Sequence, residues 1–183
     1  MTKVFFGGSR RLGRLNEQVR TRADKMMSEG LQVLVGDASG ADKAIQEFFA
    51  DRRYSRVLVF FSGESPRNNV GDWPTQAVNV DHAKRDFKFY AAKDLAMSEA
   101  ADYGLMVWDG DSQGTVNNIL NLLERGKKVV VYHSPASEFL TFRSPADAEE
   151  LLRRITPERA VELDKKVGLR QRIAASQGEI RLA

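Results

Sequence analysis

The sequence predicts an α/β fold, a Rossmann-like three-layer sandwich with a five-stranded parallel sheet, followed by C-terminal helices. Short apolar runs alternate with segments of helical apolar spacing, which is typical of βαβ units and a parallel sheet. Runs such as VLVFF at 57–61 are apolar throughout, as strands covered on both faces require. Right-handed crossovers then place helices on both faces of the sheet.

The apolar runs and the helical spacings set the expected elements. Gly30 and Gly126 follow two of the helical segments and are typical helix-ending residues. Residues 62–80 are rich in Gly, Pro, Asn and Ser, so we expect a long loop there that is functional or disordered. The expected strands are 4–6, 33–35, 57–61, 103–108 and 129–132, and the expected helices are 12–29, 41–50, 81–100 and 115–125.

The pattern changes after residue 135. Ser144-Pro145 and Thr156-Pro157 are helix-start signals, and the helix after the second signal runs to about residue 175. We therefore expect a ligand-binding domain at 1–135. Residues 136–183 are expected to form a helical extension that packs on this domain or on a partner.

Composition excludes several kinds of site. The chain has 183 residues and no cysteine, which excludes disulfides, thiolate metal sites and a cysteine nucleophile. It has two histidines, His82 and His133, and no H-E-x-x-H motif, so we expect no metal site and no cofactor.

Charge and hydropathy set the expected partners and location. There are 28 Lys and Arg against 25 Asp and Glu, and the basic residues are scattered along the chain, so we do not expect nucleic acid as a partner. The N-terminal stretch MTKVFFGGSRR has too short an apolar run for a signal peptide. No apolar stretch approaches the roughly 18 residues of a membrane span. We expect a cytoplasmic protein without a membrane partner.

The most informative residues follow the strands, because ligands of an open parallel sheet bind outside the carboxyl ends of its strands. Three of these segments carry small residues that let backbone amides approach a ligand, and the long loop from Ser62 follows the third strand. We expect the four to converge on one edge of the sheet. The three segments are GGSRRLG at 7–13, GDASGAD at 36–42 and DGDSQGT at 109–115.

The segment WDGDSQGT is the strongest candidate for a phosphate site. Gly110 and Gly114 bracket Ser112, and Thr115 opens a helix whose first amides can bind an anion. Alternatively, Ser112 or Thr115 only caps this helix.

The segment GGSRR adds donors to the same edge. Gly7 and Gly8 permit a tight turn, Ser9 can donate a hydrogen bond, and Arg10 or Arg11 can pair with a phosphate, unless these arginines are only solvated surface. The segment has neither G-x-G-x-x-G nor P-loop spacing, which argues against a dinucleotide-dependent dehydrogenase.

The segment GDASGAD supplies acceptors. Asp37 and Asp42 can hold a ribose or a base, while Ser39 and Gly40 start a helix; alternatively, Asp37 or Ser39 is a helix cap. The complete set of candidate ligand-binding residues is Gly7, Gly8, Ser9, Arg10, Gly36, Asp37, Ser39, Gly40, Asp42, Asp109, Gly110, Ser112, Gly114 and Thr115.

In their order along the chain, three segments resemble the SLOG superfamily: GGSR, GDASGAD and AKDLAMSEAADYGLMVWDGDSQGTVNNI. The superfamily groups LOG-type nucleotide phosphoribohydrolases, DNA processing protein A, molybdenum cofactor carrier proteins and YspA/YpsA-like proteins. The turns G-D-A-x-G-A-D and D-G-x-S-x-G-T are most similar to the YspA-like branch. The similarity covers residues 3–133 and implies a Rossmann-like fold that binds a nucleotide or nucleotide-derived ligand, and a homodimer.

The chain departs from the LOG enzymes at two positions. If Met97 is aligned with the methionine of their R-K-x-x-M segment, Lys93 stands at its arginine, and Asn118 stands at the glutamate of P-G-G-x-G-T-x-x-E. An asparagine cannot act as a carboxylate base, so the LOG mechanism is in doubt. The catalytic candidates are Asp37, Asp42, Lys93 and Glu99, with Asp109 and Asp111 as further carboxylates.

These observations lead us to expect a domain that binds a nucleotide-like small molecule, for sensing or processing. The first alternative is a hydrolase of N-glycosidic bonds, and the second is a protein that binds single-stranded DNA. Whether the chain is an enzyme stays open. Trp73 and Trp108 are candidates to stack on a base, and Trp108, at the end of a strand, is alternatively a core residue by position; His133, just after the last strand, is a further candidate contact.

Overall fold

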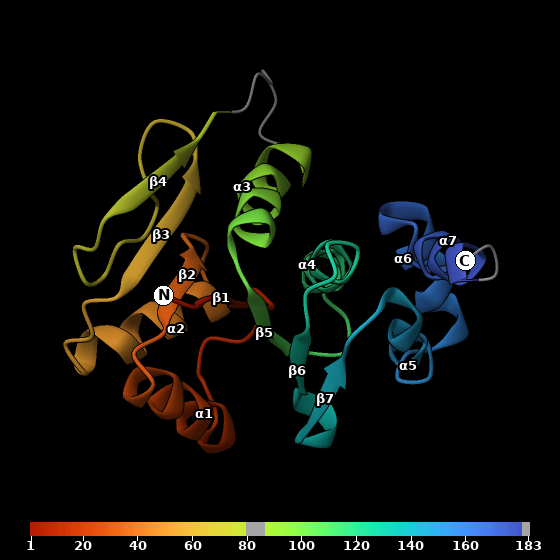
Figure 1. Cartoon of the computed structure of the whole chain (residues 1–183), viewed down its shortest axis with the longest axis horizontal. Helices are drawn as coiled ribbons and strands as arrows, with labels where there is room; N and C mark the ends of the chain where they lie inside the picture. Colours follow the sequence, from red (N-terminus) through yellow and green to blue (C-terminus); the bar gives the residue numbers. More distant parts are fainter. Residues whose placement is uncertain (80–86, 181–183) are drawn as a thin grey trace.

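A computed structural model describes residues 1–79 and 87–180 and shows a mixed sheet with helices on both faces (Figure 1). The strand order is β4-β3-β2-β1-β5-β6-β7. All neighbouring strands are parallel except β6 and β7, which are antiparallel. The strands are β1 (Lys3–Gly8), β2 (Gln32–Gly36), β3 (Val57–Ser62), β4 (Thr75–Val78), β5 (Tyr103–Trp108), β6 (Val129–His133) and β7 (Glu138–Phe142).

The α/β class is confirmed, but the expected number of five strands is wrong because the described residues form seven. The five predicted runs are β1, β2, β3, β5 and β6. β4 lies within the expected loop at 62–80, and its side chains are mostly exposed, so it has no apolar run. β7 lies beyond residue 135, where we expected helices, and it follows a short turn closed by Ser137 in the left-handed region (φ 52°).

Most of the observed helix boundaries lie within two residues of the expected ones. Asn16 caps α1 by accepting a hydrogen bond from the amide of Val19, so this helix begins later than the expected residue 12. The expected helix after Thr156 is divided at Gly168, which is left-handed (φ 65°) and ends α6. His82 and the expected helical residues 81–86 lie outside the described residues. The helices are α1 (Glu17–Ser28), α2 (Ala41–Asp51), α3 (Phe87–Ala100), α4 (Gln113–Leu123), α5 (Glu149–Leu152), α6 (Pro157–Val167) and α7 (Leu169–Ile180), with 3₁₀ turns at Ser134–Ala136 and Pro145–Ala148.

The core lies on both faces of the sheet because successive strand residues point to opposite faces. Val4 and Phe6 pack with α1 and α2 on one face, and Phe5 packs with α3 and α4 on the other. Figure 1 shows these two helix pairs on opposite sides of the sheet. Trp73 and Trp108 are both buried, so the core alternative holds for Trp108 and applies to Trp73 as well.

The C-terminal helices pack on α4 of the same chain. Leu163 of α6 and Leu169 of α7 join the core that contains Ile119 of α4. The Arg172 guanidinium donates to the carboxylate of Glu124 and to the side-chain oxygen of Asn121. Since β7 also pairs with β6, the sheet continues past residue 135, and a domain boundary there stays a prediction.

Over residues 1–79 and 87–180, no helix combines the length and the hydropathy needed to cross a membrane.

Candidate functional site

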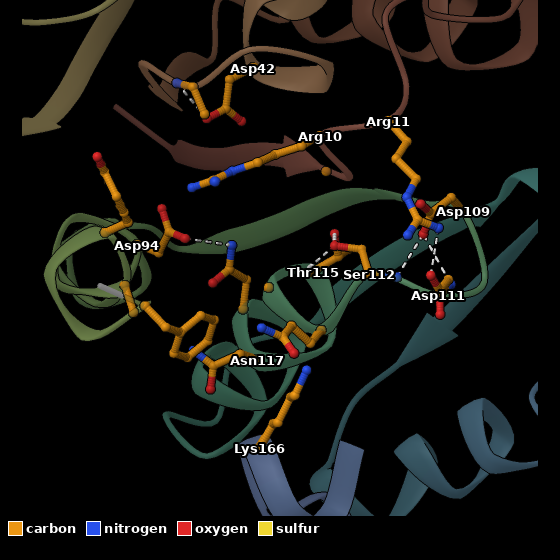
Figure 2. Close-up of a pocket in the computed structure, with 18 of the residues that line it drawn as sticks. Arg10, Arg11, Asp42, Asp94, Asp109, Asp111, Ser112, Thr115, Asn117 and Lys166 are labelled. Carbon is orange, nitrogen blue, oxygen red and sulfur yellow. Dashed lines mark hydrogen bonds and ion pairs between the residues drawn. The ribbon is translucent and has the colours of Figure 1, made fainter. Parts of the chain in front are cut away.

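A cavity of about 620 Å³ opens at the carboxyl edge of the parallel strands (Figure 2). The loops after β1, β2 and β5 line it together with α3, α4 and α6. Ten of the predicted candidate residues lie in its wall: Gly8, Arg10, Arg11, Asp42, Lys93, Asp109, Asp111, Ser112, Gly114 and Thr115.

The other predicted residues do not line this cavity. Ser39 is exposed, and Glu99 pairs with Arg125 at the surface. His133 is buried against Trp108, with 5.2 Å between the ring centroids. The predicted residues outside the lining are Gly7, Ser9, Gly36, Asp37, Ser39, Gly40, Gly110 and Glu99.

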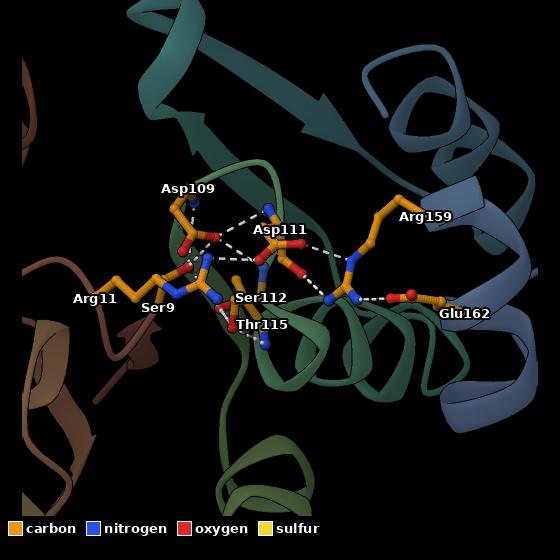
Figure 3. A network of polar contacts seen from close by, with 8 residues as sticks. All are labelled: Ser9, Arg11, Asp109, Asp111, Ser112, Thr115, Arg159 and Glu162. Atoms are coloured by element: carbon orange, nitrogen blue, oxygen red, sulfur yellow. Dashed lines mark hydrogen bonds and ion pairs between the residues drawn. The ribbon is translucent and has the colours of Figure 1, made fainter. Parts of the chain in front are cut away.

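A polar network fixes the start of α4 (Figure 3). Ser112 caps the helix, since its hydroxyl accepts a hydrogen bond from the amide of Thr115 at 3.3 Å. The carboxylate of Asp109 accepts hydrogen bonds from the amides of Asp111 (3.0 Å) and Ser112 (2.7 Å). The buried Ser9 donates to Asp109 at 3.0 Å and lies 3.2 Å from the hydroxyl of Thr115. Ser9 therefore joins two loops within the protein.

Two amides at the start of α4 are free. Within the described residues, the N–H groups of Gln113 and Gly114 have no acceptor, as expected for the first helical positions. Both residues line the cavity. A Cβ built on Gly114 meets nothing closer than the hydroxyl of Ser112 at 4.0 Å, so a ligand can approach this backbone closely. The arrangement suits an anion, because the helix start carries partial positive charge.

The C-terminal extension contributes to the same wall. Arg159 of α6 forms an ion pair with Asp111 at 2.7 Å, and Arg11 of the first loop pairs with the other carboxylate oxygen at 2.6 Å (Figure 3). Arg159 and Lys166 were not predicted as cavity residues, because the tail carries no motif that marks them.

Two further cations at the cavity are available to a ligand. Arg10 and Lys166 are exposed and form no ion pair with any residue of 1–79 or 87–180. Figure 2 shows them on opposite sides of the start of α4. The Arg10 guanidinium carbon lies 5.3 Å from the ring centroid of Tyr90.

A buried group of charged side chains forms another part of the wall. The ammonium of Lys93 lies 2.6 Å from Asp94 and 3.7 Å from Asp42, and Asn118 donates to Asp94 at 3.3 Å. Gly36 makes room for this group, since a Cβ there would lie 2.3 Å from a carboxylate oxygen of Asp42. With both carboxylates ionised, the two aspartates and the lysine carry one net negative charge.

Burial and charge shift the pKa values of these groups. Burial raises the pKa of Asp42 to about 6; Lys93 opposes the shift and Asp94 adds to it. Burial alone would lower the pKa of Lys93, but Asp94 and Asp42 outweigh it, so the pKa is raised and the ammonium stays charged.

Asp37 holds the loop that follows β3. Its side chain is fully buried and accepts three hydrogen bonds from Arg67: two from the guanidinium, at 2.5 and 2.9 Å, and one from the backbone amide at 3.0 Å. Burial acts to raise the pKa of Asp37, but these bonds outweigh it, and the pKa lies below its usual value. Neither Asp37 nor Ser39 caps α2, which begins after Gly40 without a side-chain cap. The interaction links β2 to the loop at 63–74.

Within the described residues, no group of three or more histidine, aspartate or glutamate side chains is placed to hold a metal ion.

Comparison with solved structures identifies a similar fold. DNA processing protein A from Helicobacter pylori, described for its single-stranded DNA binding mode, superposes with a TM-score of 0.56 at 14% identity, over 91% of this chain and 80% of that one. The two proteins share a fold. DNA processing protein A is among the SLOG groups named above, so the structure agrees with the resemblance at the level of the fold. No protein-family model and no curated protein matches the chain.

Proposed function

We propose that the protein binds a nucleotide or nucleotide-derived ligand in this cavity, with a phosphate at the start of α4. The observation that carries the proposal is a pair of backbone amides, those of Gln113 and Gly114, that have no acceptor within residues 1–79 and 87–180. The cavity that they line also holds Arg10 and Lys166, which form no ion pair within the same residues. Amides at a helix start and nearby cations are a common phosphate site.

The size and polarity of the cavity support a ligand of nucleotide size. A volume of about 620 Å³ lies within the roughly 300–1,000 Å³ of small-molecule pockets. The start of α4 attracts an anion, whereas the group of Asp42, Lys93 and Asp94 carries net negative charge. A ligand with a phosphate at one end and hydroxyl or amine donors at the other matches this polarity.

The branch of the superfamily, the location and the oligomeric state are proposed from the sequence. We place the chain in the YspA-like branch on its two turn motifs, and the same resemblance leads us to expect a homodimer. The expected cytoplasmic location rests instead on the hydropathy of the sequence. Sedimentation velocity measures the oligomeric state directly.

Calorimetry with AMP, ADP, ADP-ribose and cyclic AMP tests the proposal. We expect binding of at least one of them, and we expect Gly114→Asp to weaken it by about tenfold or more, because a carboxylate there repels phosphate. An acidic residue in the first helical turn stabilises a helix, so this variant should fold.

Gly114→Asn is the matched control, since it adds the same volume without the charge. We expect its affinity to lie nearer that of the wild type. The proposal is wrong if none of the four compounds binds, or if Gly114→Asp binds them as tightly as the wild type.

Binding of single-stranded DNA is a second candidate, favoured by the fold shared with DNA processing protein A. Arg10 and Lys166 would then contact successive phosphates. Fluorescence anisotropy with an oligo-dT at several salt concentrations tests this candidate. A plot of the logarithm of the binding constant against the logarithm of the salt concentration should fall, and each phosphate contact adds about −0.7 to its slope for single-stranded DNA. An affinity that does not change with salt, or no binding, removes this candidate.

A further inference from the structure

A groove of about 810 Å³ is walled by α1 on one side and by β5, β6 and β7 on the other. We call it the α1 groove. Its strand residues come mostly from the amino ends of β1, β5 and β6, whereas the cavity described above opens at the carboxyl edge, and the two share no lining residue among those described. The lining of the α1 groove includes Arg22, Lys25, Leu105, Lys128, Val130 and Phe139.

The floor of the α1 groove is apolar. The sheet register pairs Leu105 with Val130 and Tyr132 with Phe139, so these side chains lie on one face of the sheet. Val130 and Phe139 are only partly buried, and Tyr103, on the same face, is 47% exposed. Apolar surface of this kind gains free energy when a ligand removes it from water.

The chain places no second helix over this part of the sheet. Within the described residues, the helices that pack on this face are α1 and α2. After β6 the chain turns into the antiparallel strand β7 and not into a helix that would return across the same face (Figure 1). Because both faces of an α/β sheet are usually covered, the α1 groove is a part of the sheet that a bound molecule can cover.

The rim of the α1 groove is positively charged. Among its described lining residues, the cations Arg22, Lys25 and Lys128 stand against a single carboxylate, that of Glu29. Glu29 pairs with Lys25 at 3.8 Å. The side chains of Arg22 and Lys128 form no ion pair and no hydrogen bond with any residue of 1–79 or 87–180. The charge that remains to be matched at the rim is therefore positive, which suits an anion.

Arg22 limits the width of the groove. Its guanidinium carbon lies 4.2 Å from the ring centroid of Phe139, so one side chain from α1 reaches across to β7. A helix with its side chains is about 10–12 Å across, which is too wide for an opening that a single arginine bridges. An alkyl chain is narrow enough. Stacking occupies the face of the guanidinium and leaves its N–H edge available to a carboxylate.

We propose that the α1 groove binds a single-chain amphipathic anion of the fatty-acid type. The alkyl chain covers Leu105, Val130 and Phe139, and the carboxylate pairs with Arg22 and Lys128 at the rim. The volume of about 810 Å³ lies within the roughly 300–1,000 Å³ of small-molecule sites. Since the two cavities share no described lining residue, this site does not depend on the nucleotide site proposed above.

Calorimetry with octanoate, decanoate and dodecanoate, each below its micelle concentration, tests the proposal on the full chain. We expect dodecanoate to bind, and the affinity to rise by about tenfold for every two carbons, because each buried methylene adds to the transfer free energy. Dodecyltrimethylammonium, which has the same chain length and a cationic head, should bind at least tenfold more weakly than dodecanoate.

The double variant Arg22→Glu, Lys128→Glu reverses the charge of the rim at two exposed positions. It should bind dodecanoate at least tenfold more weakly than the wild type and dodecyltrimethylammonium more tightly, a gain that an unfolded variant would not show. The matched control is Arg14→Glu, Lys165→Glu, which makes the same change of charge at two exposed residues outside the groove lining and should keep the wild-type affinities.

Three outcomes would overturn the proposal, and none of them touches the nucleotide site. In the first, the wild type binds none of the three carboxylates. In the second, the groove variant and the control bind dodecanoate equally, which means that the chain binds elsewhere. In the third, sedimentation velocity shows a wild-type dimer that the groove variant dissociates and dodecanoate does not, which means that a second copy of the chain covers the groove.

Discussion

Asp37 and Asp42 are buried carboxylates on the same segment, yet their pKa values shift in opposite directions. Arg67 makes the difference, because it donates three hydrogen bonds to Asp37, whereas Asp42 has one amide and a more distant ammonium. The first carboxylate is bound within the protein, and the second keeps an oxygen open to the cavity.

Arg67→Ala should destabilise the fold in a pH-dependent way. The pKa of Asp37 is lowered in the folded protein, so its pairing with Arg67 stabilises the fold at pH values above the usual pKa of an aspartate. This stabilisation is lost as the pH falls through the pKa that Asp37 has in the folded protein. Without Arg67, the buried carboxyl must be protonated on folding. We expect a loss of about 2 kcal/mol at pH 7, less than for a fully buried pair because Arg67 is partly exposed, and a smaller loss near pH 3.

Urea unfolding at both pH values measures this effect, with Lys165→Ala as an exposed control. An equal loss at pH 7 and pH 3 would show that the interaction with Asp37 is not its cause.

The sequence predicted individual site residues where the chemistry is local. Ser112 and Thr115 lie three residues apart, and their cap is visible as a motif. The roles of Ser9 and Asp37 were not predictable, because their partners lie about 100 and 30 positions away along the chain. When a donor and an acceptor far apart in the sequence bond to each other in the fold, the sequence alone does not distinguish them from two groups that are free to bind a ligand.

At the scale of elements, α7 is attached to α4 through Arg172. Its guanidinium lies among Asn117, Asn121 and Glu124, all on one side of α4 or at its end. The start of α4 carries the proposed phosphate site, so the tail supports the helix on which that proposed site depends.

Arg172→Ala should loosen the C-terminal helices. Because the guanidinium is only partly exposed and binds a carboxylate, we expect a loss of about 2 kcal/mol and faster amide hydrogen exchange over residues 160–175 than in the sheet. Arg170→Ala is the control, since within residues 1–79 and 87–180 the Arg170 guanidinium forms an ion pair only with the nearby Asp164. Unchanged exchange in α6 and α7 would contradict the role given to Arg172.

The elements with continuous apolar runs were predictable, and the two edge strands were not. VLVFF and the GLMVW part of β5 lie in strands with a neighbour on each side, and nearly all of their residues are buried, so burial itself produces their pattern. Among the described strands β4 pairs only with β3, and its sequence TQAV faces mostly solvent. An edge strand of this kind is defined by backbone pairing, which leaves little trace in side-chain hydropathy.

At the scale of the whole molecule, the sheet brings the loops after three separate strands to one cavity, and α6 of the C-terminal tail contributes further lining residues. The convergence was predictable from the parallel strand order. The contribution of Lys166 was not, because it depends on how the tail packs on α4. The proposed binding site depends on the polarity of the resulting cavity, whose helix start at α4 suits an anion and whose wall around Asp42 carries net negative charge.

Amide chemical shifts of ¹⁵N-labelled protein during titration with AMP, and separately with adenosine, test whether the start of α4 binds phosphate. We expect AMP to shift the amides of Gln113 and Gly114 more than any others, because its phosphate accepts hydrogen bonds from them. Adenosine, which lacks the phosphate, should leave these two amides nearly unchanged. Binding of AMP that perturbs other surfaces and leaves Gln113 and Gly114 unmoved would contradict the account.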